Sequence, residues 1–282
     1  ANRLVGSEMC IRDRSNISLV ILLALIINLS SLDTIYLFNE TYLIDNLSNY
    51  MKIILVGSGI FVMLTGSKYI QVINLNKIEY PILILSSILG MMIMISSNDL
   101  IVFYMGLELQ SLALYVLASF NRDNLLSTES GLKYFVLSAL SSGLLLYGCS
   151  LTYGFSESTN FDQILINSSE FNYGTTFGIV FILVGLAFKI SAVPFHMWAP
   201  DVYQGSPTSV TLFFAILPKI AALSVFIKFL YTPFANMNDQ WQTIIVFISI
   251  ASMIFGAVAA IGQKNLKRLI DYSSISHMGY AL

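Results

Sequence analysis

Charged side chains are scarce in this 282-residue chain: Asp, Glu, Lys and Arg together make up only 11% of it. Soluble domains carry about 25%. The two cysteines and two histidines form no CxxC pair or Cys/His cluster, so a metal site or a disulfide has little support. A glycine-rich nucleotide loop is also missing. Because the net charge is −2, the composition argues against a nucleic-acid partner as well.

Hydrophobic residues, by contrast, make up 56% of the chain and gather in long apolar runs. A helix needs about 20 apolar residues to cross a bilayer. The sequence therefore predicts an all-α, polytopic membrane protein with about nine membrane-spanning helices. The expected spans are residues 17–30, 52–66, 81–96, 100–120, 132–153, 176–200, 209–231, 241–262 and 266–282.

The loops between these spans differ in charge. If each span crosses once, the loops at residues 31–50, 154–175 and 232–240 share one side, and they contain acidic residues but no Lys or Arg. The other side receives the basic residues Lys68, Lys77, Arg122, Lys264, Lys267 and Arg268. Lys and Arg are enriched in loops on the cytoplasmic side. We therefore expect the basic side to face a bacterial cytoplasm or a mitochondrial matrix.

The first 14 residues, ANRLVGSEMCIRDR, are charged and aperiodic, unlike the sequence that follows. VGSEMCIRDR resembles a translated sequencing adapter. We expect residues 1–14 to be a non-native leader, to be excluded from fold reasoning. A genuine charged leader is the alternative.

The sixth span is interrupted by the stretch FKISAVPFHMWAPDVYQGSP, residues 188–207. After an apolar run, it brings together Lys189, Pro194, His196, Trp198, Pro200, Asp201 and Pro207. A proline removes a backbone donor and kinks a helix, and unwound backbone at membrane depth must be packed in protein or line a wet cavity. We predict a broken helix that crosses once, beside a polar pathway; His196 could also simply cap its carbonyls.

Ionisable residues inside membrane spans are functional-site hypotheses by default. Glu108 lies in the fourth span, Lys189 before the break, Lys219 in the seventh span and His277 in the last. Burial disfavours a charged lysine, whereas a nearby carboxylate favours it. A lysine whose carboxylate partner can approach or retreat can therefore take up and release a proton. This favours a relay of protonatable groups, although His277 could also be a hydrogen-bonded core histidine.

Other charged residues have simpler explanations. Glu129 precedes Lys133 by four residues, which is typical of an exposed helical ion pair. Lys228 lies near a span end, where a lysine can extend to the membrane surface. We expect Glu129 and Asp271 to be interfacial.

Five segments carry a specific resemblance: GLELQSLALYVLASF, STESGLKYFVLSALSSGLLLYG, FKISAVPFHMWAPDVYQGSPTSV, PKIA and QKNLKRLIDYSSISHMGY. In this order they resemble the antiporter-like membrane subunits of respiratory complex I, the family of NADH–ubiquinone oxidoreductase chain 2, called subunit N in bacteria. The resemblance covers most of residues 80–282. VPFHMWAPDVYQGSPT is far more specific than a proline-rich membrane segment alone.

The resemblance implies an antiporter-like bundle with two inverted five-helix repeats, each with a broken helix. Residues 15–79 are then N-terminal helices, residues 80–231 a complete first repeat and residues 232–282 the start of a second, truncated one. The implied proton relay is Glu108, Lys133, Lys189 and Lys219. Further broken-helix and axis candidates are Pro194, His196, Asp201, Pro207, Ser273 and His277.

Two departures from the family pattern bear on completeness. The family has three spans before the first repeat, whereas this chain shows two, and the missing span falls where the suspect leader stands. The chain also stops inside the second repeat. We expect either a second polypeptide that carries the missing C-terminal helices or a partial record.

The resemblance implies a proton-translocating subunit that couples NADH:ubiquinone oxidoreduction to proton pumping, with no cofactor or redox centre in this chain. The implied partners are other membrane-arm subunits and lipid. The expected location is the mitochondrial inner membrane, or alternatively the bacterial plasma membrane. Two alternatives are a cation/proton antiporter subunit of the same ancestry and a structural scaffold without transport.

Overall fold

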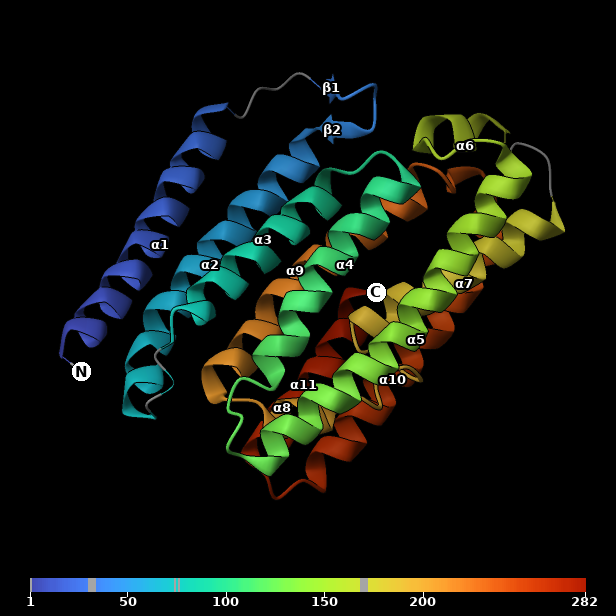
Figure 1. The fold of residues 1–282 in the computed structure, drawn as a ribbon. Helices are drawn as coiled ribbons and strands as arrows, with labels where there is room; N and C mark the ends of the chain where they lie inside the picture. The colour runs from blue at the N-terminus through green and yellow to red at the C-terminus, as the bar shows by residue number, and fades with distance from the viewer. Residues whose placement is uncertain (1, 30–33, 74, 76, 168–171) are drawn as a thin grey trace.

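The computed structural model describes residues 2–29, 34–73, 75, 77–167 and 172–282, with residues 2–10 described by their backbone alone. Long helices lie side by side in a bundle (Figure 1). They are α1 (Asn2–Leu29), α2 (Asn46–Val72), α3 (Glu79–Ser96), α4 (Leu100–Ala118), α5 (Leu125–Ser156), α6 (Phe161–Asn167), α7 (Tyr173–Lys189), α8 (Ala199–Gly205), α9 (Thr208–Tyr231), α10 (Asn238–Ile261) and α11 (Leu266–Ala281). A 3-10 turn, η1 (Ala235–Met237), precedes α10.

A short hairpin joins α1 to α2, and the all-α prediction did not include it. Its strands β1 (Ile35–Leu37) and β2 (Tyr42–Ile44) pair antiparallel. α1 begins at Asn2, so residues 2–14 continue into the first span instead of standing apart from it. The non-native origin of this segment stays a prediction.

Each predicted span coincides with a helix, with α7 and α8 together forming the sixth. Within the described residues, six helices are long and apolar enough to cross a membrane: α2, α3, α4, α5, α9 and α10 with its preceding turn. α7 is a shorter apolar helix. The expected count of nine is therefore only partly met, because α1 carries charges at its start and α11 carries Lys267, Arg268 and Asp271 in 16 residues.

The loops gather at two ends of the bundle that differ in charge (Figure 1). We call one the acidic end: the hairpin with its flanks (residues 34–45) and residues 97–99, 157–167 and 232–237, described loops without Lys or Arg. There Asn98 Nδ2 donates to Glu40 O at 3.2 Å and to Asp162 Oδ2 at 3.0 Å. The basic end holds Lys77, Arg122 and Lys264. This confirms that the loops alternate as predicted.

Negative charge is dense at the acidic end. The pKa of the Tyr36 hydroxyl is raised from its ordinary value, first by the charge of Asp162, then by partial burial and by Glu40 and Asp45. Negative neighbours disfavour ionisation of a phenol to an anion.

Glycines set the closest helix contacts. A Cβ on Gly90 of α3 would lie 2.6 Å from the Gln110 amide nitrogen of α4, and one on Gly106 of α4 would lie 2.8 Å from the Met94 nitrogen. Small residues let membrane helices approach backbone to backbone. Close approaches of the same kind occur between α5 and α7 at Gly148 and Gly178, and between α10 and α11 at Gly256 and Gly279.

We expect Gly106→Ala to destabilise the protein by about 1–3 kcal/mol, because the methyl group must push α3 and α4 apart. Gly143→Ala is the matched control, since Gly143 is also helical but has nothing within 4 Å of an added Cβ. Alanine is the better helix former there. Thermal unfolding of the full-length purified protein would compare the two, and equal transition midpoints would contradict the close contact.

Candidate functional site

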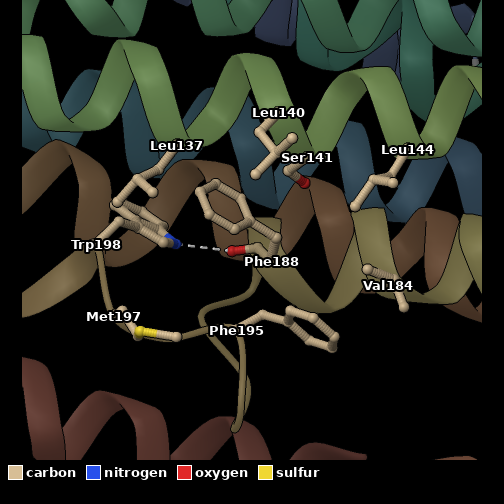
Figure 2. Close-up of a pocket in the computed structure, with 9 residues that line it drawn as sticks. All are labelled: Leu137, Leu140, Ser141, Leu144, Val184, Phe188, Phe195, Met197 and Trp198. Carbon is tan, nitrogen blue, oxygen red and sulfur yellow. Dashed lines mark hydrogen bonds between the residues drawn. The ribbon is translucent and has the colours of Figure 1, made fainter.

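The predicted break lies between the end of α7 at Lys189 and the start of α8 at Ala199. Ser191 takes a left-handed conformation with φ of 61°, which turns the chain away from the helix axis. The Trp198 indole Nε1 donates to the Phe188 carbonyl oxygen at 3.0 Å (Figure 2). The Val193 amide donates to Ser252 Oγ of α10 at 2.9 Å. The break is thus confirmed, and neighbouring protein groups satisfy polar atoms that it frees.

One face of this break is apolar. A pocket of about 170 Å³ lies between α5, α7 and the connecting segment, as Figure 2 shows. Its lining residues are Leu137, Leu140, Ser141, Leu144, Val184, Phe188, Phe195, Met197 and Trp198. Ser141 contributes a hydroxyl, the Trp198 N–H is already bonded to Phe188, and the other lining side chains are apolar, so a polar pathway must use another face of the break.

Lys189 occupies such a polar face. Its side chain lies in the interior, with the residue only 6% exposed. Its Nζ donates to Ser111 Oγ of α4 at 2.8 Å and to Ser138 Oγ of α5 at 2.7 Å. Tyr115 extends this chain by donating its hydroxyl to Ser138 Oγ at 2.7 Å. Among the described residues no carboxylate forms an ion pair with Lys189, so neutral hydroxyls hold this ammonium group.

Glu108 lies one turn before Ser111 on α4 and is half-buried. Its Oε1 is buried without a hydrogen-bond partner in the described part of the chain. The charge of Glu108 acts on Lys189 without a direct ion pair. This is the arrangement expected of a carboxylate that can approach or retreat from its lysine.

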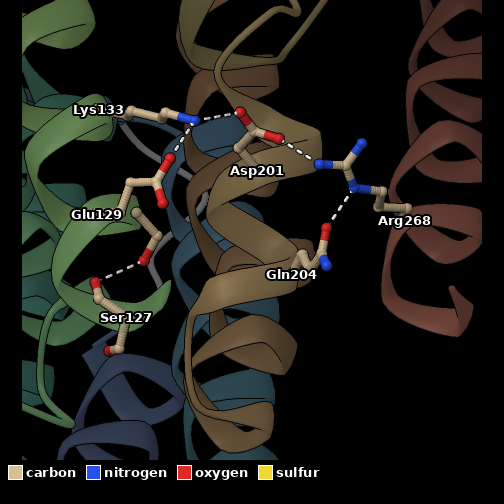
Figure 3. A network of polar contacts seen from close by, with 7 residues as sticks. Ser127, Glu129, Lys133, Asp201, Gln204 and Arg268 are labelled. Carbon is tan, nitrogen blue, oxygen red and sulfur yellow. Dashed lines mark hydrogen bonds and ion pairs between the residues drawn. The ribbon is translucent and has the colours of Figure 1, made fainter. Parts of the chain in front are cut away.

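Lys133 does not contact Lys189. Its Nζ pairs with Glu129 Oε1 at 2.7 Å, as the helical spacing predicted, and with Asp201 Oδ2 of α8 at 2.8 Å (Figure 3). The other oxygen of Asp201, Oδ1, accepts a hydrogen bond from Arg268 Nη2 of α11 at 2.5 Å. Arg268 Nε donates to Gln204. We call this group the basic-end network. It ties the broken helix to α5 and α11.

Lys219 forms a third polar cluster. It is 5% exposed, its Nζ donates to Ser274 Oγ of α11, and it lies 5.5 Å from the centroid of the Tyr203 ring. Asp271, one turn before Ser274, has 0% exposure. Asp271 therefore faces the interior of the bundle, because this face of α11 turns inward against α8 and α9. Its expected position at the membrane interface stays a prediction.

The remaining candidates are spread around these clusters. Ser273 and His277 line a groove of about 480 Å³ beside Lys219. The His196 ring lies 4.5 Å, centroid to centroid, from Phe255 of α10. Pro194 is exposed in the connecting segment, whereas Pro207 is buried where α9 begins.

Sequence reasoning misplaced one lysine and overlooked another. Lys228 was expected to reach the membrane surface, but it is buried and its Nζ lies 3.5 Å from the Ile95 carbonyl oxygen. Lys52 is buried as well and donates to the Tyr42 hydroxyl at 3.0 Å. The charges of Asp45 and Asp162, carboxylates of the acidic end, act on Lys228. Because Lys228 has these polar groups around it inside the bundle, its side chain does not need to extend to the membrane surface.

The sequence-based prediction also missed the serine partners of Lys189 and Lys219. Ser111, Ser138 and Ser274 fall in apolar spans, where a serine is common. Two of these serines follow a charged residue on the same helix by three residues, which places both side chains on one face: Ser111 follows Glu108, and Ser274 follows Asp271. This spacing could have predicted that they lie in a polar cluster.

Residues 97–282, which include Lys133, Lys189, Lys219 and Lys228 together with Glu108 and Asp271, match the family described as NADH:quinone oxidoreductase/Mrp antiporter, TM. The chain belongs to this family of membrane subunits. The resemblance carried by the five motifs is thereby confirmed. Division of the NADH:quinone oxidoreductase/Mrp antiporter fold into repeats at residues 80–231 and 232–282 stays a prediction.

Individual relatives agree with the family. A NADH-quinone oxidoreductase subunit N of Pelagibacter ubique is 73% identical over 267 residues, which are 94% of this chain and 56% of the relative. A chain of respiratory complex I from Thermus thermophilus matches with a TM-score of 0.82 and 30% identity, over 97% of this chain and 58% of that one.

A second solved structure extends the comparison to another respiratory complex. A chain of the membrane-bound sulfane sulfur reductase, an archaeal complex, matches with a TM-score of 0.78 and 26% identity over 84% of this chain and 49% of that one. These matches confirm the antiporter-like helix bundle. The chain spans about half the length of the relatives it matches.

Proposed function

We propose that this chain is part of a proton-translocating core membrane subunit of respiratory complex I. In this role it couples NADH:quinone oxidoreduction elsewhere in the complex to proton movement through Glu108, Lys189 and Lys219, with Lys133 at the basic end. The observation that carries the proposal is the buried Lys189 ammonium, which is held by two serine hydroxyls beside a carboxylate that is not fixed to it.

The energetics are compatible with this role. Moving one proton against about 100 mV requires about 2.3 kcal/mol. A change of one pKa unit corresponds to about 1.36 kcal/mol, so a pKa shift of about two units in a relay group matches the energy required.

Partners and location follow from the same proposal. The relatives named subunit N are parts of NADH-quinone oxidoreductases, so we propose other complex I membrane-arm subunits and lipid as neighbours, and no redox centre in this chain. A second polypeptide with the remaining helices is a further proposed partner. The bacterial relatives favour the bacterial plasma membrane over the mitochondrial inner membrane.

Glu108→Gln in the complete complex tests the proposal. The amide keeps the size of the side chain but removes the charge that acts on Lys189. We expect NADH-driven proton translocation in liposomes to fall severalfold. Glu79→Gln, a change at an exposed glutamate of α3, is the matched control. Normal translocation in an assembled Glu108→Gln complex would support a scaffold role instead.

A cation/proton antiporter subunit is the second candidate, because the matching family includes Mrp antiporters. Sodium-dependent proton exchange without NADH, lost in a Lys189→Met variant, would favour it. Proton translocation that requires NADH and ignores sodium favours complex I.

A further inference from the structure

Asp271 is a buried carboxylate that none of the sequence motifs assigned to the relay. It lies on α11 with 0% exposure, and in the described part of the chain neither Oδ1 nor Oδ2 has a hydrogen-bond partner. A buried ionised carboxylate without hydrogen bonds is costly unless a cation compensates it or a proton neutralises it. Its surroundings must therefore supply one or the other.

Charged and titratable groups reach Asp271 from the helices around it. Lys219 of α9 and Arg268, one turn earlier on α11, are the cations whose charge acts on the carboxylate. Tyr203 of α8 is fully buried, and its ring lies 5.5 Å from the Lys219 Nζ. The cluster thus combines an acid, an amine and a phenol in one buried place.

Lys219 is the one buried cation of this cluster that can release a proton, because arginine stays protonated. A proton that passes from the Lys219 ammonium to the Asp271 carboxylate leaves a neutral amine and a neutral carboxylic acid. The total charge of the pair is zero before and after. The exchange therefore adds no net charge to the interior, which is the condition for a low-cost transfer in a medium of low dielectric constant.

Toward the start of α11, Asp271 is followed by Arg268 and then by the basic end of the bundle. Arg268 belongs to the basic-end network and holds Asp201, whose other oxygen binds Lys133 (Figure 3). These side chains line a polar cavity of about 150 Å³. Arg268, Asp271 and Ser274 follow each other at intervals of three residues, about 4.5 Å along the helix axis each. They form a polar row from this cavity to Lys219.

We propose that Asp271 is a relay residue that carries protons between the polar cavity at the basic end and Lys219. This inference rests on the proposed function and adds to it a second carboxylate and a route along α11. In this arrangement Asp271 acts on Lys219 much as Glu108 acts on Lys189, so each of these two lysines has its own carboxylate.

The test is Asp271→Asn in the complete complex, with Asp271→Glu as the conservative variant and Asp239→Asn, at an exposed aspartate of α10, as the control. We expect Asp271→Asn to lower NADH-driven proton translocation by about 10²-fold. Asp271→Glu should recover part of it. Infrared difference spectra during turnover should show a carboxylic C=O band that is lost in the Asn variant, which a purely structural role would not produce.

The possible results separate this inference from the proposed function. If the complex with Asp271→Asn translocates protons normally and the complex with Lys189→Met does not, the relay role of Asp271 is wrong, but the proposed function still holds. If both pump normally, the proposed function fails first. If the Asp271→Asn complex does not assemble, the Asp271→Glu complex tests the relay role. Its pH profile of proton translocation should be shifted relative to the unmodified complex. An unchanged pH profile overturns the inference.

Discussion

Lys189→Met is expected to lower proton translocation by about 10²-fold or more, the usual contribution of a positioned proton-transfer group. Methionine has a similar length and suits a site that is 6% exposed, so the complex should still assemble. The two serines that lose the ammonium keep other partners. Ser111 donates to the Leu107 carbonyl at 2.7 Å, and Ser138 accepts from Tyr115.

Lys228→Met is the matched control for this prediction. Lys228 is 5% exposed, also lies at the end of an apolar helix, and undergoes the same chemical change, but the carboxylates whose charges act on it are Asp45 and Asp162 of the acidic end. Proton uptake by liposomes with the reconstituted complex, normalised to NADH oxidation, compares the variants. An equal loss in both would show that any buried lysine matters, and that Lys189 holds no special place.

The second large effect concerns stability. Lys219→Met leaves the Asp271 carboxylate buried without the nearby lysine cation. Arg268 cannot replace this cation fully, because it already bonds to Asp201 and Gln204. Removing one partner of a buried pair costs up to about 3–5 kcal/mol, and protonation of the Asp271 carboxylate lowers that cost. We therefore expect a marked fall in the unfolding temperature of the protein or in its level in the assembled complex.

Adding Asp271→Asn to Lys219→Met should restore most of that stability, because the double variant no longer buries an uncompensated charge. A double-mutant cycle measured by thermal unfolding gives the coupling energy between the two sites. Additive losses in the double variant would mean that Lys219 and Asp271 do not form a pair. Translocation should remain low in the double variant, which separates stability from function.

The break and the buried lysines could be predicted because each violates a local rule of membrane helices. Prolines and a charge within 188–207 leave few alternatives to a broken helix. Asp271 could not be placed in this way, since it lies three residues after the basic pair Lys267 and Arg268 and thus looked interfacial. Its burial depends on how α8 and α9 pack on α11, which no local pattern encodes.

Side-chain contacts between different helices could not be predicted from the sequence either. The ion pair of Lys133 with Glu129 follows from helical spacing, whereas its second bond to Asp201 joins residues 68 positions apart. Lys228 was misplaced for a related reason: its position along α9 was known, but the polar groups of other helices around it were not.

Under the proposed function, the crowding of carboxylates at the acidic end has a consequence for the rate at which protons released there leave the protein. A negative surface potential attracts cations, including protons, and salt screens it over about 8 Å at physiological ionic strength. The same groups that raise the pKa of Tyr36 should therefore hold a released proton near the surface. Its escape to bulk water should become faster as the salt concentration rises, even though the buried relay steps are unchanged.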